Sequence, residues 1–184
     1  MIDDLTTWQT TLAALPQVGD SSWAGNFAAW VDDRVSSKMS LPGIGGPGLS
    51  FTFSVSTFET ELLGLEETGD QAAAMEAFAD AWGLAMSAST AAVAVNSYIE
   101  PIGPTTTWSQ VDTTVIDPGS IADGKVKINE LATSEPVEDA ADSDFAVIFR
   151  EAFLLLTITT SGLDSTPPGS GGPLPLVDTE RPVA

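Results

Sequence analysis

The sequence predicts a helix-dominated α+β fold that ends in an extended C-terminal arm. Three observations indicate this class. Apolar residues recur every three or four positions in several segments, which is the spacing of one helix face. Apolar and polar residues alternate in a few short segments, as they do along a half-buried strand. The segment after residue 162 is rich in proline and glycine, and this composition favours an extended chain.

The first forty residues predict a helical hairpin. An apolar stripe from Ile2 to Leu15 indicates the first helix, and Pro16 ends it because proline has no main-chain N–H to donate. Ser21 or Ser22 can cap a second helix. The apolar residues of that second helix keep the same spacing: Trp23, Phe27, Trp30, Val31 and Val35.

A connector is predicted at residues 41–50, because glycine and proline are too frequent there for regular structure. A short strand follows, since Phe51, Phe53 and Val55 alternate with hydroxyl residues. The spacing then becomes that of a short helix, with apolar residues at Phe58, Leu62 and Leu65.

The longest periodic segment predicts a central helix from Asp70 to about Tyr98. Asp70 is a suitable N-cap, because its carboxylate can accept main-chain N–H groups of the first turn. Most other positions are alanine, which is a strong helix former and small enough for close helix contacts. One face carries the large apolar side chains: Met75, Phe78, Trp82 and Met86.

Residues 101–133 predict loops with one or two short strands. The run Asp117-Pro118-Gly119 is a turn signal, and the alternation in residues 125–128 is typical of a strand.

A last amphipathic helix is predicted over residues 145–156. The acidic stretch of residues 135–144 precedes it and suits the positive end of the helix dipole. Arg150 and Glu151 are expected on its solvent side.

The chain is expected to form a single compact domain, residues 1–162, and an extended Pro/Gly-rich C-terminal arm, residues 163–184. Glycine and proline in residues 165–175 argue against helix or sheet there. The two interpretations of the arm are a segment held by a partner and a disordered tail.

Four residues are candidate interface residues. Leu174, Leu176 and Val177 are apolar positions at nearly alternate spacing in the arm, which suits an extended peptide lying along a neighbouring subunit. Trp108 stands alone in a threonine-rich loop, and tryptophan is enriched among the residues that anchor protein interfaces.

The charge balance restricts the class of partner. Six basic residues stand against 26 acidic ones, giving a formal net charge of -20. This excludes binding to nucleic acid and to anionic membrane surfaces, because both depend on lysine and arginine. The expected partners are other protein subunits of a large assembly, in a homo-oligomer. The acidic N-terminus and the lack of a long apolar run predict a soluble chain without a secretory signal.

Missing residue types exclude several chemistries. The chain has no cysteine and no histidine, so it cannot form disulfides, Ser-His-Asp triads or Cys/His zinc sites.

Three motifs have a chemical and a structural interpretation, and the structural one is preferred for each. Residues 43–48 could form a phosphate-binding loop or a hinge. Asp139, Asp142 and Asp144 could bind calcium or mark the start of a helix. The acid pairs could be hydrolytic groups or part of a solvated face, and they are Asp3-Asp4, Asp32-Asp33, Glu66-Glu67 and Glu138-Asp139. We therefore expect no catalytic, cofactor-binding or metal-binding residue.

The sequence resembles small virion structural proteins of tailed bacteriophages. The resemblance is carried by the helical hairpin, the run Leu-Pro-Gly-Ile at residues 41–44, the Phe-Thr-Phe strand, the alanine-rich helix and the arm with Pro-Leu-Pro-Leu at residues 173–176. It implies a non-enzymatic neck or connector, tail or baseplate, or capsid cement component, located in a virion that assembles in the host cytoplasm.

Two other functions are kept as alternatives. An acidic binding module would recognise a basic protein partner through its surface charge. An enzyme would need a concave cluster of acids with raised pKa values, and the sequence does not indicate one.

Overall fold

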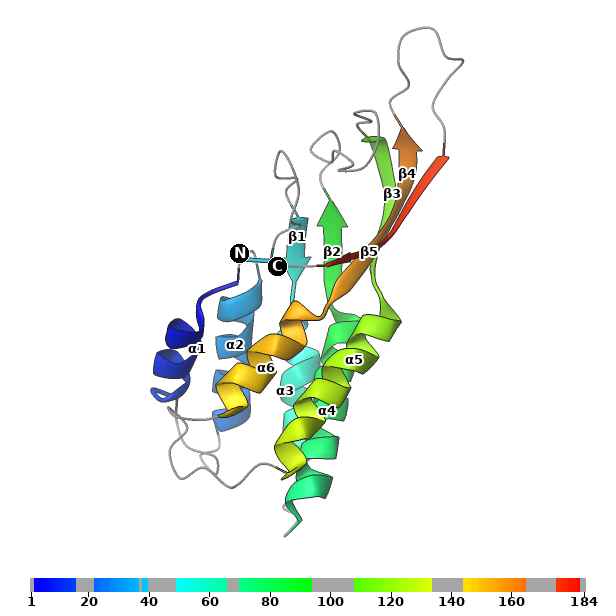
Figure 1. Ribbon diagram of the computed structural model, residues 1–184. Coiled ribbons are helices and arrows are strands. Elements are labelled where there is room, and N and C mark those ends of the chain that lie inside the picture. The colour runs from blue at the N-terminus through cyan, green and yellow to red at the C-terminus, as the bar shows by residue number, and fades with distance from the viewer. Residues whose placement is uncertain are drawn as a thin grey trace, which may run out of the picture.

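A computed structural model describes residues 2–15, 22–36, 38–39, 49–65, 70–93, 108–133, 144–164 and 175–182. Its helices form a body, and its strands extend from one side of that body (Figure 1). The fold is therefore α+β and helix-dominated, as the sequence predicts. In chain order the elements are α1 (Leu5–Leu12), α2 (Trp23–Val35), β1 (Leu49–Thr52), α3 (Val55–Leu63), α4 (Gln71–Ala88), β2 (Thr90–Val93), β3 (Trp108–Ile116), α5 (Pro118–Asn129), the 3-10 helix η1 (Glu130–Thr133), α6 (Asp144–Leu154), β4 (Thr157–Asp164) and β5 (Pro175–Pro182).

The helical hairpin at the start of the chain is confirmed. Asp4 caps α1, because its carboxylate accepts the main-chain N–H of Thr7 at 2.8 Å. α2 lies beside α1 (Figure 1), and Trp30 Nε1 donates a hydrogen bond to Thr11 Oγ1 at 2.9 Å. The buried Trp8 ring meets the Trp30 ring edge-on, with their centroids 5.2 Å apart.

The central helix α4 is confirmed, but it is shorter than predicted. Asp70 caps it by accepting the main-chain N–H groups of Ala72 and Ala73. The helix ends at Ala88 instead of near Tyr98. β2 follows at once and pairs antiparallel with β1. The strand predicted from Phe51 to Val55 is therefore only partly right, because β1 begins at Leu49, inside the predicted connector, and Val55 already starts α3. Pairing between distant segments overrides the helix propensity of the alanines.

The interpretation of residues 101–133 as loops and short strands is wrong for its second half, which forms α5 and η1. Asp117 is an N-cap that accepts the N–H of Gly119 at 3.2 Å, and Pro118 occupies the first helical position. The run that looked like a turn is therefore a helix start. The buried residues Ile121, Gly124 and Ile128 follow helical spacing, which outweighs the alternation of residues 125–128.

The last part of the chain forms α6 and two strands. α6 confirms the predicted amphipathic helix, and the buried Leu156 lies just beyond its end. β4 was not predicted, and it lies between β3 and β5 in an antiparallel sheet of order β3-β4-β5. The proposed boundary after residue 162 falls inside β4. Residues 175–182 are extended, as expected of the arm, but they pair with β4 of their own chain.

The hydrophobic core lies mainly among the helices, and aromatic rings in contact with one another form its centre. Trp82 of α4 and Phe153 of α6 are fully buried, with ring centroids 5.6 Å apart. Phe78 and Phe149 continue the same contact between α4 and α6 at 5.5 Å. The apolar face predicted for α4 is thus confirmed as core.

Helices α4 and α5 approach each other closely because glycines lie at their contact. A Cβ at Gly124 would overlap the Trp82 ring. A Cβ at Gly83 would lie 2.8 Å from Cδ of Lys125, whose aliphatic stem crosses α4 at this point. Glycine at these two positions therefore fixes the distance between the helices.

Candidate interaction surface

Three of the four predicted interface residues lie in the β3-β4-β5 sheet. Trp108 opens β3 opposite Asp164, which is the last residue of β4. Leu176 and Val177 lie near the start of β5, opposite residues 162 and 161 of β4. Trp108 and Leu176 therefore flank β4 on its two sides, opposite β4 residues that are only two positions apart. The prediction that Trp108 lies in a loop is wrong, because it is the first residue of a strand.

These residues mark the end of the sheet that is farthest from the helices. β3 leads into α5 and β4 follows α6, so the other end of the sheet adjoins the helices (Figure 1). β4 has eight residues, and a rise of about 3.3 Å per residue places its end roughly 23 Å from its start. Leu174, the fourth candidate, lies outside the described residues. We call this end, residues 108–110, 162–164 and 175–177, the sheet tip.

The outermost strands of the two sheets have an edge without a partner strand in the part of the chain that the structure describes. β1 pairs only with β2, and β5 pairs only with β4 among the described strands. An unpaired strand edge presents main-chain N–H and C=O groups in a row, and these groups can pair with a strand of another chain. Both sheets therefore offer an edge for protein contact.

A small hollow lies where the two sheets meet. β2 lies beside β3, although the two strands belong to different sheets. The hollow has a volume of about 230 Å³, and its lining includes Met86, Ser89, Ala91, Thr114 and Val115. It is smaller than the pockets of about 300–1,000 Å³ that hold drug-sized ligands. Its lining mixes hydroxyl and apolar groups.

Five of the six basic side chains form ion pairs or hydrogen bonds within the chain. Lys125 pairs with Asp80, and Lys127 Nζ lies 2.8 Å from Glu130 and 2.9 Å from Glu151. The hydrogen bonds from Lys127 to Glu130 and then to Glu151 raise the pKa of Lys127 above its ordinary value. The remaining three basic side chains, Arg34, Lys38 and Arg150, contact Asp3.

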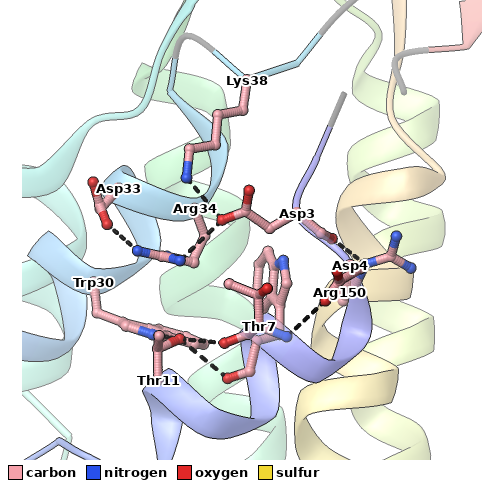
Figure 2. Close-up of polar contacts among 10 residues, drawn as sticks. Asp3, Asp4, Thr7, Thr11, Trp30, Asp33, Arg34, Lys38 and Arg150 are labelled. Carbon is pink, nitrogen blue, oxygen red and sulfur yellow. Dashed lines mark hydrogen bonds and ion pairs between the residues drawn. The ribbon is translucent and has the colours of Figure 1, made fainter.

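Asp3 fastens the start of the chain to two helices (Figure 2). Its carboxylate accepts hydrogen bonds from Arg34 Nη1 in the last turn of α2 at 2.9 Å and from Lys38 Nζ, just beyond the end of α2, at 2.7 Å. Its carbonyl oxygen accepts from Arg150 Nε of α6 at 2.9 Å. Arg150 was expected to face solvent, and its contact with Asp3 corrects that expectation. The neighbouring Glu151 pairs with Lys127 and remains partly exposed.

The acid pairs at Asp3-Asp4 and Asp32-Asp33 take part in structural contacts. The N–H of Thr7 holds the pKa of Asp4 below its ordinary value, because it stabilises the charged carboxylate. Asp32 accepts a hydrogen bond from Ser36, and Asp33 pairs with Arg34. The partly buried Asp3 does not lie on the solvated face that was expected of the acid pairs, whereas Asp33 is exposed.

Several predicted sites lie outside the described residues. They include the glycine loop at residues 43–48, the acid pairs at residues 66–67 and 138–139, and two of the calcium candidates, Asp139 and Asp142. Asp144, the third, is the first residue of α6. Within the described ranges, the structure contains no group of three or more acidic side chains placed to hold a metal ion.

Sequence reasoning missed two features of this surface. β4, which supports both Trp108 and β5, begins with four β-branched residues at 157–160, and this run was a usable strand signal. Asp3 belongs to an acid pair like several others, and its contacts depend on Arg34 and Arg150, which are distant in sequence. No local pattern could have distinguished it.

Among the helices that the structure describes, none combines the length and the apolar character needed to cross a membrane. No family model matches the chain, and neither a curated protein nor a solved structure matches it significantly.

Proposed function

We propose that this chain is a non-enzymatic structural subunit that assembles with copies of itself and with other protein subunits. The observation that carries the proposal is that β1 and β5, on one side of the helical body, each have an edge that pairs with no other described strand. Main-chain groups at such edges favour strand pairing between chains. The sheet tip, with Trp108 and Leu176, lies at the far end of one of these sheets and supplies apolar residues for the same contact.

The assembly that fits the sequence best is the virion of a tailed bacteriophage. The chain would act there as a neck or connector, tail or baseplate, or capsid cement component. This step rests on the resemblance described above. Subunits of such assemblies act through complementary surfaces, and the strands that extend from the helical body provide one.

The native mass of the purified protein tests the first step. Light scattering across a series of protein and NaCl concentrations should show a defined oligomer, and higher salt should favour it because a formal charge of -20 opposes self-association. A monomer under all conditions would overturn the proposal.

The composition of purified phage particles tests the virion assignment. The chain should be present in them at a fixed stoichiometry. Its absence from the particles would overturn the virion assignment but not the proposal that the chain assembles.

A second function is supported by the engagement of five of the six basic side chains in internal contacts, which leaves the excess acids for external partners. A binding module of this kind would be a monomer that captures one basic protein. Its Kd should rise steeply with NaCl concentration. A structural subunit held by main-chain pairing and apolar contacts should show the opposite dependence on salt.

A further inference from the structure

β5 has the position of an element that can change partners. It is the last described element of the chain, and it lies at the edge of its sheet. Among the described strands it pairs only with β4, so its departure would leave the β3–β4 ladder in place.

The connection to β5 is long enough for two destinations. Ten residues, 165–174, separate the end of β4 from the start of β5, and they include Pro167, Pro168 and Pro173. Ten residues can span up to about 33 Å, whereas neighbouring strands lie about 4.8 Å apart. The connection can therefore return to β4 of its own chain or reach β4 of an adjacent one.

We propose that β5 is a donated strand that leaves its own β4 and pairs with β4 of a second copy when chains assemble. The second copy is the natural acceptor, because its β4 presents an identical edge once its own β5 has left. Exchange then recreates the same ladder between chains and needs no new contact surface. The inference rests on the proposed function, since it names the contact through which the copies would be joined.

Concentration determines which pairing dominates. In a dilute monomer the ten-residue connection keeps β5 at a high effective concentration near its own β4, so the internal ladder forms. In an assembly a neighbouring β4 lies within reach at a comparable effective concentration. Exchange can therefore compete with the internal ladder in the assembled state but not in the dilute free chain.

Single cysteines can distinguish the two pairings, because the natural sequence contains none. Ser161 of β4 lies directly opposite Val177 of β5, and opposite residues in an antiparallel pair are close enough for a disulfide. One population of chains would carry Ser161→Cys and another Val177→Cys. The two are mixed, assembled, oxidised and examined on a denaturing gel without reductant. Coupling between the two kinds of chain above the level of the control mixture indicates that β5 of one lies on β4 of the other.

Donation predicts that the assembled mixture gives covalent dimers of one chain of each kind, whereas the dilute mixture gives none. The control mixture carries Thr114→Cys and Thr160→Cys, which lie opposite each other in the β3–β4 ladder. This control should remain uncoupled, because β3 and β4 stay in one chain. A second pair, Gly162→Cys with Leu176→Cys, gives an independent measurement at the adjacent position if a first variant folds poorly.

Two results would overturn the inference, and they have different meanings. Assembled chains that fail to couple at both positions, while a single chain with both Ser161→Cys and Val177→Cys closes its disulfide internally, would show that each chain keeps its own β5. The proposed assembly would then stand without strand donation. Chains that remain monomeric at all concentrations and salt levels would remove both the assembly and the donation.

Discussion

At the scale of single residues, Gly124 is the position where the fold depends most on the absence of a side chain. Ala is the better helix former by about 1 kcal/mol, so propensity alone predicts that Gly124→Ala is stabilising. The overlap with the fully buried Trp82 ring reverses this expectation. We expect Gly124→Ala to destabilise the protein by about 1–3 kcal/mol, measured by urea unfolding.

Val126→Ala is the matched control for Gly124→Ala, because Val126 lies on the same helix and is 68% exposed. It should change the stability by no more than about 0.5 kcal/mol. If Gly124→Ala were as neutral as the control, the packing of Trp82 against α5 would be incorrect.

The N-cap of α1 predicts a specific dependence on pH. The pKa of Asp4 in the folded chain lies below its ordinary value of 3.8, so its charged form adds stability above that pH. This contribution is lost as the pH falls through the lower, folded-state pKa. Asp4→Asn keeps a good cap without the titration. Thermal melts should show the two proteins converging below about pH 4, and parallel curves down to about pH 2 would contradict the cap.

The residue scale also shows what local sequence can and cannot reveal. The caps at Asp4 and Asp70 and the buried side chain of Trp82 follow from residue type and spacing, and Asp70 and Trp82 were predicted on that basis. The contact of Asp3 with Arg34 and Arg150 joins three parts of the chain that only the folded structure brings together.

At the scale of elements, the first segment of the chain is fastened by charge as well as by apolar packing. Asp3→Asn removes the carboxylate that Arg34 and Lys38 share, and the Arg34 side chain is only 13% exposed. We expect a loss of about 1–3 kcal/mol, because hydrogen bonds to charged groups contribute about that much. Amide exchange should rise in α1 more than in α4.

The control for Asp3→Asn is Asp33→Asn, which also removes an acid paired with Arg34. The Asp33 side chain is 68% exposed, so its pair is expected to contribute less than about 1 kcal/mol. Equal losses from the two variants would mean that Asp3 does not fasten the segment.

Elements were predictable where one period dominated and failed where two signals competed. α2, α4 and α6 have long apolar stripes that no strand would tolerate. In α5 a run of four alternating residues favours a strand, but the Asp-Pro helix start and the helical spacing of Ile121, Gly124 and Ile128 prevail. β2 and β4 depend on partners far along the chain, so their pairing could not be predicted locally.

At the scale of the whole molecule, the helical core and the last strand are expected to be separable. Deleting residues 165–184 removes β5 and spares β4, whose last residue is Asp164. We expect the truncated chain to keep its near-ultraviolet circular dichroism, because the aromatic core lies among the helices. Light scattering should show that it no longer assembles.

Two outcomes of the truncation would be informative in different ways. Loss of the near-ultraviolet signal would mean that β5 is part of the folding unit and would contradict the division between core and arm. Unchanged assembly would mean that the chains meet through another surface, of which the β1 edge is the first candidate.

The distribution of tryptophan makes these two parts of the molecule separately visible to fluorescence. Trp8, Trp23, Trp30 and Trp82 lie in helices, and Trp108, the fifth, opens a strand at the sheet tip. A variant that keeps only Trp108, with phenylalanine at the other four positions, would emit from the sheet alone. A chain that keeps the four helical tryptophans would emit from the body alone. Comparing their emission during assembly would show which part of the molecule meets its neighbour first.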